Sequence, residues 1–169
     1  MSTGSASAAT SKTTWFIIFF ALVVSVGIYG LLCFLMAQSR STPSGNSLGT
    51  LRPIFYVLAG ASLLASIAWM HFKTYGKIGG SPVSPATTAA TLLSPQEFQT
   101  VSITGLAMAE ACSIYGLVLF FIGAPIMEFA RFAAGTLAVD LLYILPKGIS
   151  YWAAWEMQQK SGEQPSSRA

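Results

Sequence analysis

The sequence predicts an all-α integral membrane protein, a four-helix bundle made of two duplicated transmembrane helical hairpins. Of its 169 residues, 53% are hydrophobic and only 9% are charged, whereas soluble domains carry about 25% charged residues. Four apolar stretches are each long enough for a spanning helix, which needs about 20 residues. Together they form one transmembrane domain over residues 15–157, with helices expected at 15–37, 53–72, 95–123 and 125–157.

The first half of the chain is read from its apolar runs and the polar segments around them. Residues 1–14 are mostly Ser, Thr and Ala, and we expect a disordered N-terminal tail. The run at 15–37 is too long for the core of a signal peptide, so it is interpreted as a retained first helix. Pro53 suits the first turn of the second helix. The loop at 73–93 contains Gly and Pro breakers.

The second half contains clearer signals for where helices begin, turn and break. Ser94-Pro95-Gln96-Glu97 predicts a helix start, with Ser94 as N-cap and Glu97 completing a capping box. Gly123-Ala124-Pro125 predicts a tight turn into the fourth helix. Pro146-Lys147-Gly148 should kink or break that helix. Residues 158–169 form a polar C-terminal tail.

Charge and reactive residues exclude several functions. The net charge of +3 comes from scattered bases, so no nucleic-acid partner is expected. Cys33 and Cys112 lie in apolar runs and are interpreted as buried thiols, and no Cys/His spacing predicts a metal site. The sequence has no nucleophile–base pair and no Gly-rich phosphate loop, so the chain is not expected to be catalytic by itself. No organic cofactor is expected.

Basic residues in the loops predict the orientation of the bundle. With four spans, the two tails and the 73–93 loop share one side of the membrane. That side carries more Lys and Arg than the other, which favours cytoplasmic termini. Its basic residues are Lys12, Lys73, Lys77, Lys160 and Arg168, and those of the opposite side are Arg40, Arg52 and Arg131. A bacterial inner membrane is the simplest location.

Glu110 is the residue most suggestive of function. It is the only carboxylate in the stretch from Val101 to Gly123, near the middle of the third predicted helix. A charge there costs about 2.5–3.5 kcal/mol on insertion scales. A carboxyl group in such a place is therefore a hypothesis of a functional site. The alternative is a carboxyl that only fixes helix register through hydrogen bonds, as polar residues do in membrane bundles.

A short repeat links the first and third helices. Ile28-Tyr29-Gly30-Leu31 recurs as Ile114-Tyr115-Gly116-Leu117, each time in the first helix of a predicted hairpin. The recurrence predicts an internal duplication, with a chance match in apolar sequence as the alternative. In this alignment Val24 occupies the place of Glu110.

The segment from Gly105 to Val118, Gly-Leu-Ala-Met-Ala-Glu-Ala-Cys-Ser-Ile-Tyr-Gly-Leu-Val, resembles the carboxylate helix of the rotor-ring c subunit, or proteolipid, of rotary ATP synthases. The resemblance implies that Glu110 is the ion-binding carboxylate, loaded and unloaded as a ring turns past a stator subunit. It also implies that Tyr115 lies near that carboxylate. A c-like protein would form a homo-oligomer in membrane lipid and serve as a membrane subunit of a proton-translocating ATP synthase.

Asp140 is a second candidate for the same site. Glu110 and Asp140 lie equally far along the chain from Pro125, so both carboxyl groups are expected at one depth. They could share a proton. They could instead hold Na⁺ with oxygens of Ser113 or Tyr115, since hard cations take oxygen ligands. An ion pair of Asp140 with Lys147, two turns on, is the alternative use of Asp140.

The small residues Gly105, Ala109 and Gly116 share one strip of the third helix and are interpreted as a helix-packing seam. The functional hypothesis is proton transport through Glu110, in or like a rotor ring. The alternative is a small structural or assembly membrane protein that keeps the c-like helix without transporting ions.

Overall fold

The computed structural model describes residues 3–39, 48–75 and 92–162, and every regular element among them is helical. Four helical segments are long and apolar enough to cross a membrane, which confirms the predicted all-α membrane fold. The elements are α1 (Thr3–Ser39), α2 (Leu48–Thr74), α3 (Pro95–Phe121), α4 (Ile126–Val139), the π-helical turn η1 (Asp140–Ile144) and α5 (Leu145–Gly162). The segments α4, η1 and α5 together make the fourth span.

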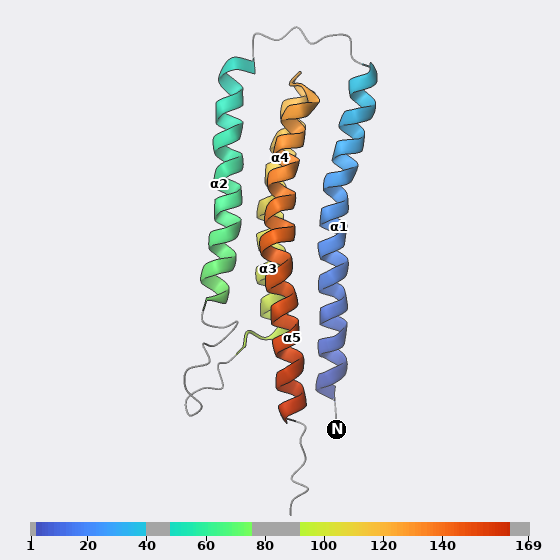
Figure 1. The fold of residues 1–169 in the computed structure, drawn as a ribbon, viewed down its shortest axis with the longest axis vertical. Helices are drawn as coiled ribbons and strands as arrows, with labels where there is room; N and C mark the ends of the chain where they lie inside the picture. Colours follow the sequence, from blue (N-terminus) through green and yellow to red (C-terminus); the bar gives the residue numbers. More distant parts are fainter. Residues whose placement is uncertain (1–2, 40–47, 76–91, 163–169) are drawn as a thin grey trace, which may run out of the picture.

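The centre of the bundle is α3. It packs against α1, α2 and α4, and α1 also contacts α4. Figure 1 shows α1 and α2 on either side of the pair formed by α3 and the last span. Contacts between α1 and α2 are nearly absent. The two helices predicted to form the first hairpin therefore lie apart, with the second hairpin between them. The duplication itself stays a prediction.

The first helix is longer than expected. It begins at Thr3, so residues 3–14 are helical where the sequence predicted a disordered tail. Its apolar part starts at Ser11. Polar contacts hold this end to the bundle: Ser11 Oγ donates to Gln99 at 3.2 Å and Lys12 Nζ pairs with Glu156 at 2.5 Å. Of the predicted loop and C-terminal tail, residues 76–91 and 163–169 lie outside the described part of the chain.

The start of α3 and the turn after it confirm two local predictions. Ser94 Oγ accepts from the backbone N–H of Glu97, and the Ser94 N–H donates back to Glu97 Oε2 at 3.0 Å, which completes the capping box. After α3, Gly123 adopts a φ of 107°. Glycine has no Cβ and takes this conformation at little cost, so the chain can reverse directly into α4.

The predicted break at Pro146 does not occur. The helix runs on through Pro146 and Gly148 to Gly162, and the irregularity lies upstream, in η1. There the Leu145 N–H donates to Asp140 O, five residues back. Proline has no N–H and its ring displaces the carbonyl of the preceding turn. A widened turn just before Pro146 accommodates that change without ending the helix.

An aromatic cluster fills the end of the bundle that carries the N-terminus. Phe98 and Tyr151 stack at 3.8 Å between ring centroids, and Trp15 lies 6.2 Å from Phe98. Tyr151 donates its hydroxyl proton to Leu93 O at 2.7 Å. Trp15 also contacts Gly148, where a Cβ would lie only 2.1 Å from Trp15 Cη2. These contacts fix α1, α3 and α5 together below the candidate site.

Candidate functional site around Glu110

Glu110 lies near the middle of α3 and points to α1. Its side chain is 9% exposed. Its Oε1 atom accepts a hydrogen bond from Tyr29 at 3.2 Å and another from Ser25. Ser25 and Tyr29 lie one turn apart on the same face of α1. The carboxyl group therefore lies between two helices, away from both the lipid-facing surface and the ends of the bundle.

Ser25 can serve two protonation states of Glu110. A serine hydroxyl has one proton to donate and lone pairs to accept with. In the structure Ser25 Oγ has two acceptors in reach, Leu22 O at 2.7 Å and Glu110 Oε1. When Ser25 donates to Glu110, a carboxylate receives two hydrogen bonds. When Ser25 donates to Leu22, its oxygen can accept the proton of a neutral Glu110.

Asp140 is the second carboxyl group of this site. It is 1% exposed, it opens the π-helical turn η1, and its Oδ1 atom has no hydrogen-bond partner. The turn η1 contacts α3, the helix that carries Glu110. Neither carboxyl group takes part in the ion pairs found among the described residues. Two carboxyl groups that come close together in a low-dielectric interior can share a proton.

The alternative ion pair between Asp140 and Lys147 is not formed. Lys147 Nζ contacts Tyr143 OH at 2.8 Å and Thr74 Oγ1 at 3.4 Å, and it also lies over the ring of Tyr143. The prediction assumed regular α-helix between positions 140 and 147. The widened turn of η1 shifts the register, and a shift of one residue rotates a side chain by roughly 100° about the axis.

Ser113 belongs to a neighbouring network that joins α3 to α4. Its hydroxyl donates to Thr136 Oγ1 at 2.8 Å, and Thr136 contacts Ala109 O at 3.0 Å. All three residues are buried. This link holds Thr136, and Asp140 one turn further along the chain, beside the turn of α3 that carries Glu110.

Tyr115 is not brought to Glu110. It packs against Phe55 of α2 with ring centroids 6.0 Å apart. Five residues along an α-helix correspond to roughly 140° around the axis, so Tyr115 faces α2 while Glu110 faces α1. Neither Ser113 nor Tyr115 hydrogen-bonds to Glu110, because Ser113 donates to Thr136 and Tyr115 packs on Phe55. Na⁺ as the transported ion stays a prediction.

The three small residues of α3 lie at helix contacts. A Cβ at Gly105 would come within 2.9 Å of Met70 Cγ in α2, and one at Gly116 within 2.7 Å of Phe132 Cβ in α4. Ala109 is fully buried and its carbonyl oxygen accepts from Thr136. The strip therefore contacts two neighbouring helices rather than one.

Sequence reasoning missed Ser25 and Tyr29. A polar pair spaced by four residues in an otherwise apolar helix was the available indication. The repeat alignment drew attention to Val24 instead, and Val24 is 57% exposed, on the outside of the bundle. A further buried carboxyl group, Glu128, lies near the start of α4, where it accepts a hydrogen bond from Tyr56 and pairs with Arg131 at 3.5 Å.

The fold and the site define an integral membrane protein with two buried carboxyl groups inside a helical bundle. Comparison with protein-family models, curated protein sequences and solved structures finds no match to this chain.

Proposed function

We propose that this protein carries protons across the membrane through Glu110, as or like the ion-translocating c subunit of a rotary ATP synthase. The observation that carries the proposal is the presence of two buried carboxyl groups on contacting elements, α3 and η1, neither of them in an ion pair of the described residues. Glu110 has partners for both protonation states, and Asp140 has an unpartnered oxygen. Ionisable groups inside membrane bundles mark ion pathways and proton relays.

The proposed chemistry is a proton exchange within the pair. A proton that passes from Glu110 to Asp140 Oδ1 breaks one O–H bond and forms another, and the two groups together keep the same total charge. Because Oδ1 has no hydrogen-bond partner in the structure, the two carboxyl groups must first come within hydrogen-bond distance. Tyr29 and Ser25 then stabilise the Glu110 carboxylate by donating two hydrogen bonds. In the reverse transfer the proton returns from Asp140 Oδ1 to Glu110, and the Ser25 hydroxyl rotates toward Leu22 O.

The c-like form of this proposal requires more than one chain. A rotor ring needs many copies and a stator-like partner in the lipid bilayer, and the sequence resemblance of the Glu110 segment supports that assembly. In the described chain the Glu110 carboxyl faces its own α1, so each copy would bring its own site. Native mass measured in mild detergent tests the assembly. A ring of many copies supports the rotor form, and a monomer or dimer contradicts it.

Proton flux in reconstituted vesicles tests the proposed transport. Glu110→Gln keeps the size and an acceptor oxygen for Tyr29, so the protein should fold, while it removes the exchangeable proton. We expect flux driven by a potassium diffusion potential to fall to the level of protein-free vesicles. Glu156→Gln is the matched control, since this exposed carboxylate pairs with Lys12 at the end of the bundle, and its flux should equal wild type.

The second candidate function is structural. Both hydrogen bonds to Glu110 come from α1, so the carboxyl group also fastens α1 to α3. In a scaffold or assembly protein this would be its whole role. Wild-type flux equal to that of empty vesicles, together with lower stability of Glu110→Leu, would favour this candidate over transport.

A further inference from the structure

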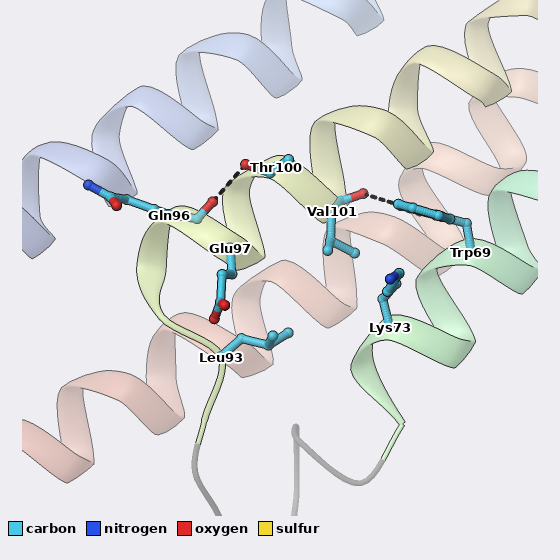
Figure 2. A pocket seen from close by; sticks show the side chains of 7 residues that line it. All are labelled: Trp69, Lys73, Leu93, Gln96, Glu97, Thr100 and Val101. Carbon is cyan, nitrogen blue, oxygen red and sulfur yellow. Dashed lines mark hydrogen bonds between the residues drawn. The ribbon is translucent and has the colours of Figure 1, made fainter.

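The two ends of the bundle differ in the balance of their charged groups. At the end that carries the N-terminus, a pocket of about 430 Å³ is lined by one base and one acid, Lys73 of α2 and Glu97 of α3 (Figure 2). At the opposite end, the described residues include two arginines, Arg52 of α2 and Arg131 of α4, and one carboxyl group, Glu128. That end therefore has an excess of positive charge.

The carboxyl group of Glu128 is already bound by its neighbours in the bundle. It is buried, it accepts a hydrogen bond from Tyr56, and its Oε1 atom lies 3.5 Å from Arg131 Nη1. Arg131 Nη1 also lies 3.4 Å from Tyr56 OH. The Arg131 side chain is 63% exposed, and a guanidinium has five N–H donors. Arg131 thus offsets the charge of Glu128 and still has donors for a further acceptor.

Arg52 lacks a counter-charge of this kind. It takes part in neither of the ion pairs found in the described part of the chain. Its Nε atom is buried and has no hydrogen-bond partner. A buried donor without an acceptor costs free energy, because its hydrogen bond to water is lost, and the cost is larger for a charged group. An anion that accepts from this guanidinium would remove that cost.

The two arginines meet at Tyr56. Arg52 and Tyr56 lie one turn apart on the same face of α2. A side chain on a helix covers the turn on the N-terminal side of its own Cα, so the Tyr56 ring extends over the turn that carries Arg52. Arg131 reaches the Tyr56 hydroxyl from α4. Both guanidinium groups are therefore presented to the same part of this end of the bundle.

This part of the bundle lies at the edge of the apolar spans. The span of α2 begins at Gly49 and the last span begins at Ile126, so each arginine lies within the first two turns of its span. Large apolar side chains nearby are exposed, among them Val57 and Met127. Arginine in such a place lays its stem along apolar surface and extends its charge toward the headgroups. The acceptor is therefore expected to belong to a lipid, whose chains cover the apolar surface beside it.

We propose that Arg52 and Arg131 together bind the phosphate of an anionic phospholipid headgroup, as in phosphatidylglycerol. The Arg52 guanidinium turns outward and donates from Nε and Nη to two phosphate oxygens, which is the bidentate geometry that arginine favours. Arg131 donates to the same phosphate from α4 with N–H groups that do not face Glu128. A lipid with a net negative charge balances the excess charge at this end. Phosphatidylcholine brings its own cation to the site and so binds more weakly.

Native mass spectrometry of the full chain with added phosphatidylglycerol or phosphatidylcholine tests this proposal. We expect wild type to bind phosphatidylglycerol about tenfold more tightly, the ratio for one hydrogen bond to a charged group. Arg52→Gln should lower phosphatidylglycerol binding to the level of phosphatidylcholine. It should fold, because it removes a charged group whose buried Nε has no partner. Arg131→Lys keeps a charge beside Glu128 but loses the planar fork, so it should also weaken phosphatidylglycerol binding.

Lys73→Gln is the matched control, because it removes one positive charge at the other end of the bundle, in the pocket of Figure 2. It should keep the wild-type preference. Equal binding of the two lipids by wild type, an unchanged preference in Arg52→Gln or Arg131→Lys, or a loss in Lys73→Gln as large as in Arg52→Gln would overturn the proposal. Competition by water-soluble glycerophosphoglycerol at the same concentration as the lipid would also overturn it, because the ligand would then be a soluble phosphodiester.

Discussion

Tyr29 and Tyr115 occupy equivalent places in the repeated tetrapeptide, yet only one of them touches the candidate site. Tyr29 donates to Glu110, whereas Tyr115 stacks on Phe55. The resemblance to c subunits implies a role for Tyr115, and the geometry gives that place to Tyr29. Variants of these two tyrosines can therefore show whether contact with Glu110 or position in the repeat determines their effect.

Tyr29→Phe should destabilise the protein and lower proton flux, because it removes one hydrogen-bond donor to the buried Glu110 carboxyl group. Hydrogen bonds between membrane helices contribute about 0.6–2 kcal/mol, and we expect a loss in that range in unfolding from mixed micelles. Tyr115→Phe is the control and should unfold and conduct like wild type. The opposite ranking of the two variants would contradict the site geometry and favour the role that the resemblance implies.

Some residues of the candidate site could be predicted from the sequence and others could not. Glu110 and Asp140 are detectable because a carboxyl group in an apolar run is conspicuous. Ser25 and Tyr29 are not, because a hydroxyl group in a membrane helix becomes significant only when a polar group of another helix faces it. Which side of α1 meets α3 is a property of packing, and the exposed face of Val24 shows that alignment of the repeats does not supply it.

At the scale of elements, the length of the apolar runs and the residues typical of helix starts and turns predicted the spans. The π-helical turn η1 was not predicted. The capping box at Ser94 and Glu97 is encoded by neighbouring residues and is present. The π-helical turn is not encoded in this way, since Pro146 indicates a disturbed helix without saying where the disturbance falls. Asp140 opens that turn. π-Helical turns in α-helices occur frequently at functional sites, which agrees with the proposed role of Asp140.

Gly148→Ala tests the packing of α5 against α1. A Cβ there would lie 2.1 Å from Trp15 Cη2, and Trp15 is itself fixed by Phe19 and Phe98. We expect a loss of about 1–3 kcal/mol in the free energy of unfolding, as for other overpacked sites.

Gly27→Ala is the matched control, because a Cβ at Gly27 meets nothing within 4 Å. It should be neutral or should stabilise α1 by up to about 1 kcal/mol through helix propensity. Both variants can be measured by the same unfolding titration in mixed micelles. Equal stability of the two would mean that the aromatic cluster moves aside without cost.

At the scale of the whole molecule, the four spans give the bundle two ends that carry different parts of the chain. The start of α1, the end of α2, the start of α3 and the end of α5 lie at one end of the bundle, as Figure 1 shows, and the turn between α3 and α4 lies at the opposite end. Glu110, near the middle of α3, lies between these ends. With cytoplasmic termini, as the basic residues favour, the end that carries the start of α1 faces the cytoplasm.

Cysteine labelling tests this orientation. In a background with Cys33→Ala and Cys112→Ala, we expect Ile122→Cys to react with a membrane-impermeant maleimide in intact bacterial cells. Tyr75→Cys, exposed at the end of α2, should react only after the cells are opened. The reverse pattern would place the termini outside the cell.

The separation of α1 from α2 has a consequence for how the protein is made. Chains are synthesised from the N-terminus, so α1 and α2 enter the bilayer before α3 exists, and in the finished bundle they scarcely touch. Their partner arrives with the third segment. Ser25 and Tyr29 are by then already within the bilayer, so the acidic side chain of the incoming helix finds its donors in place on insertion. Ribosome-bound intermediates that end before Pro95 should therefore keep the first two segments apart.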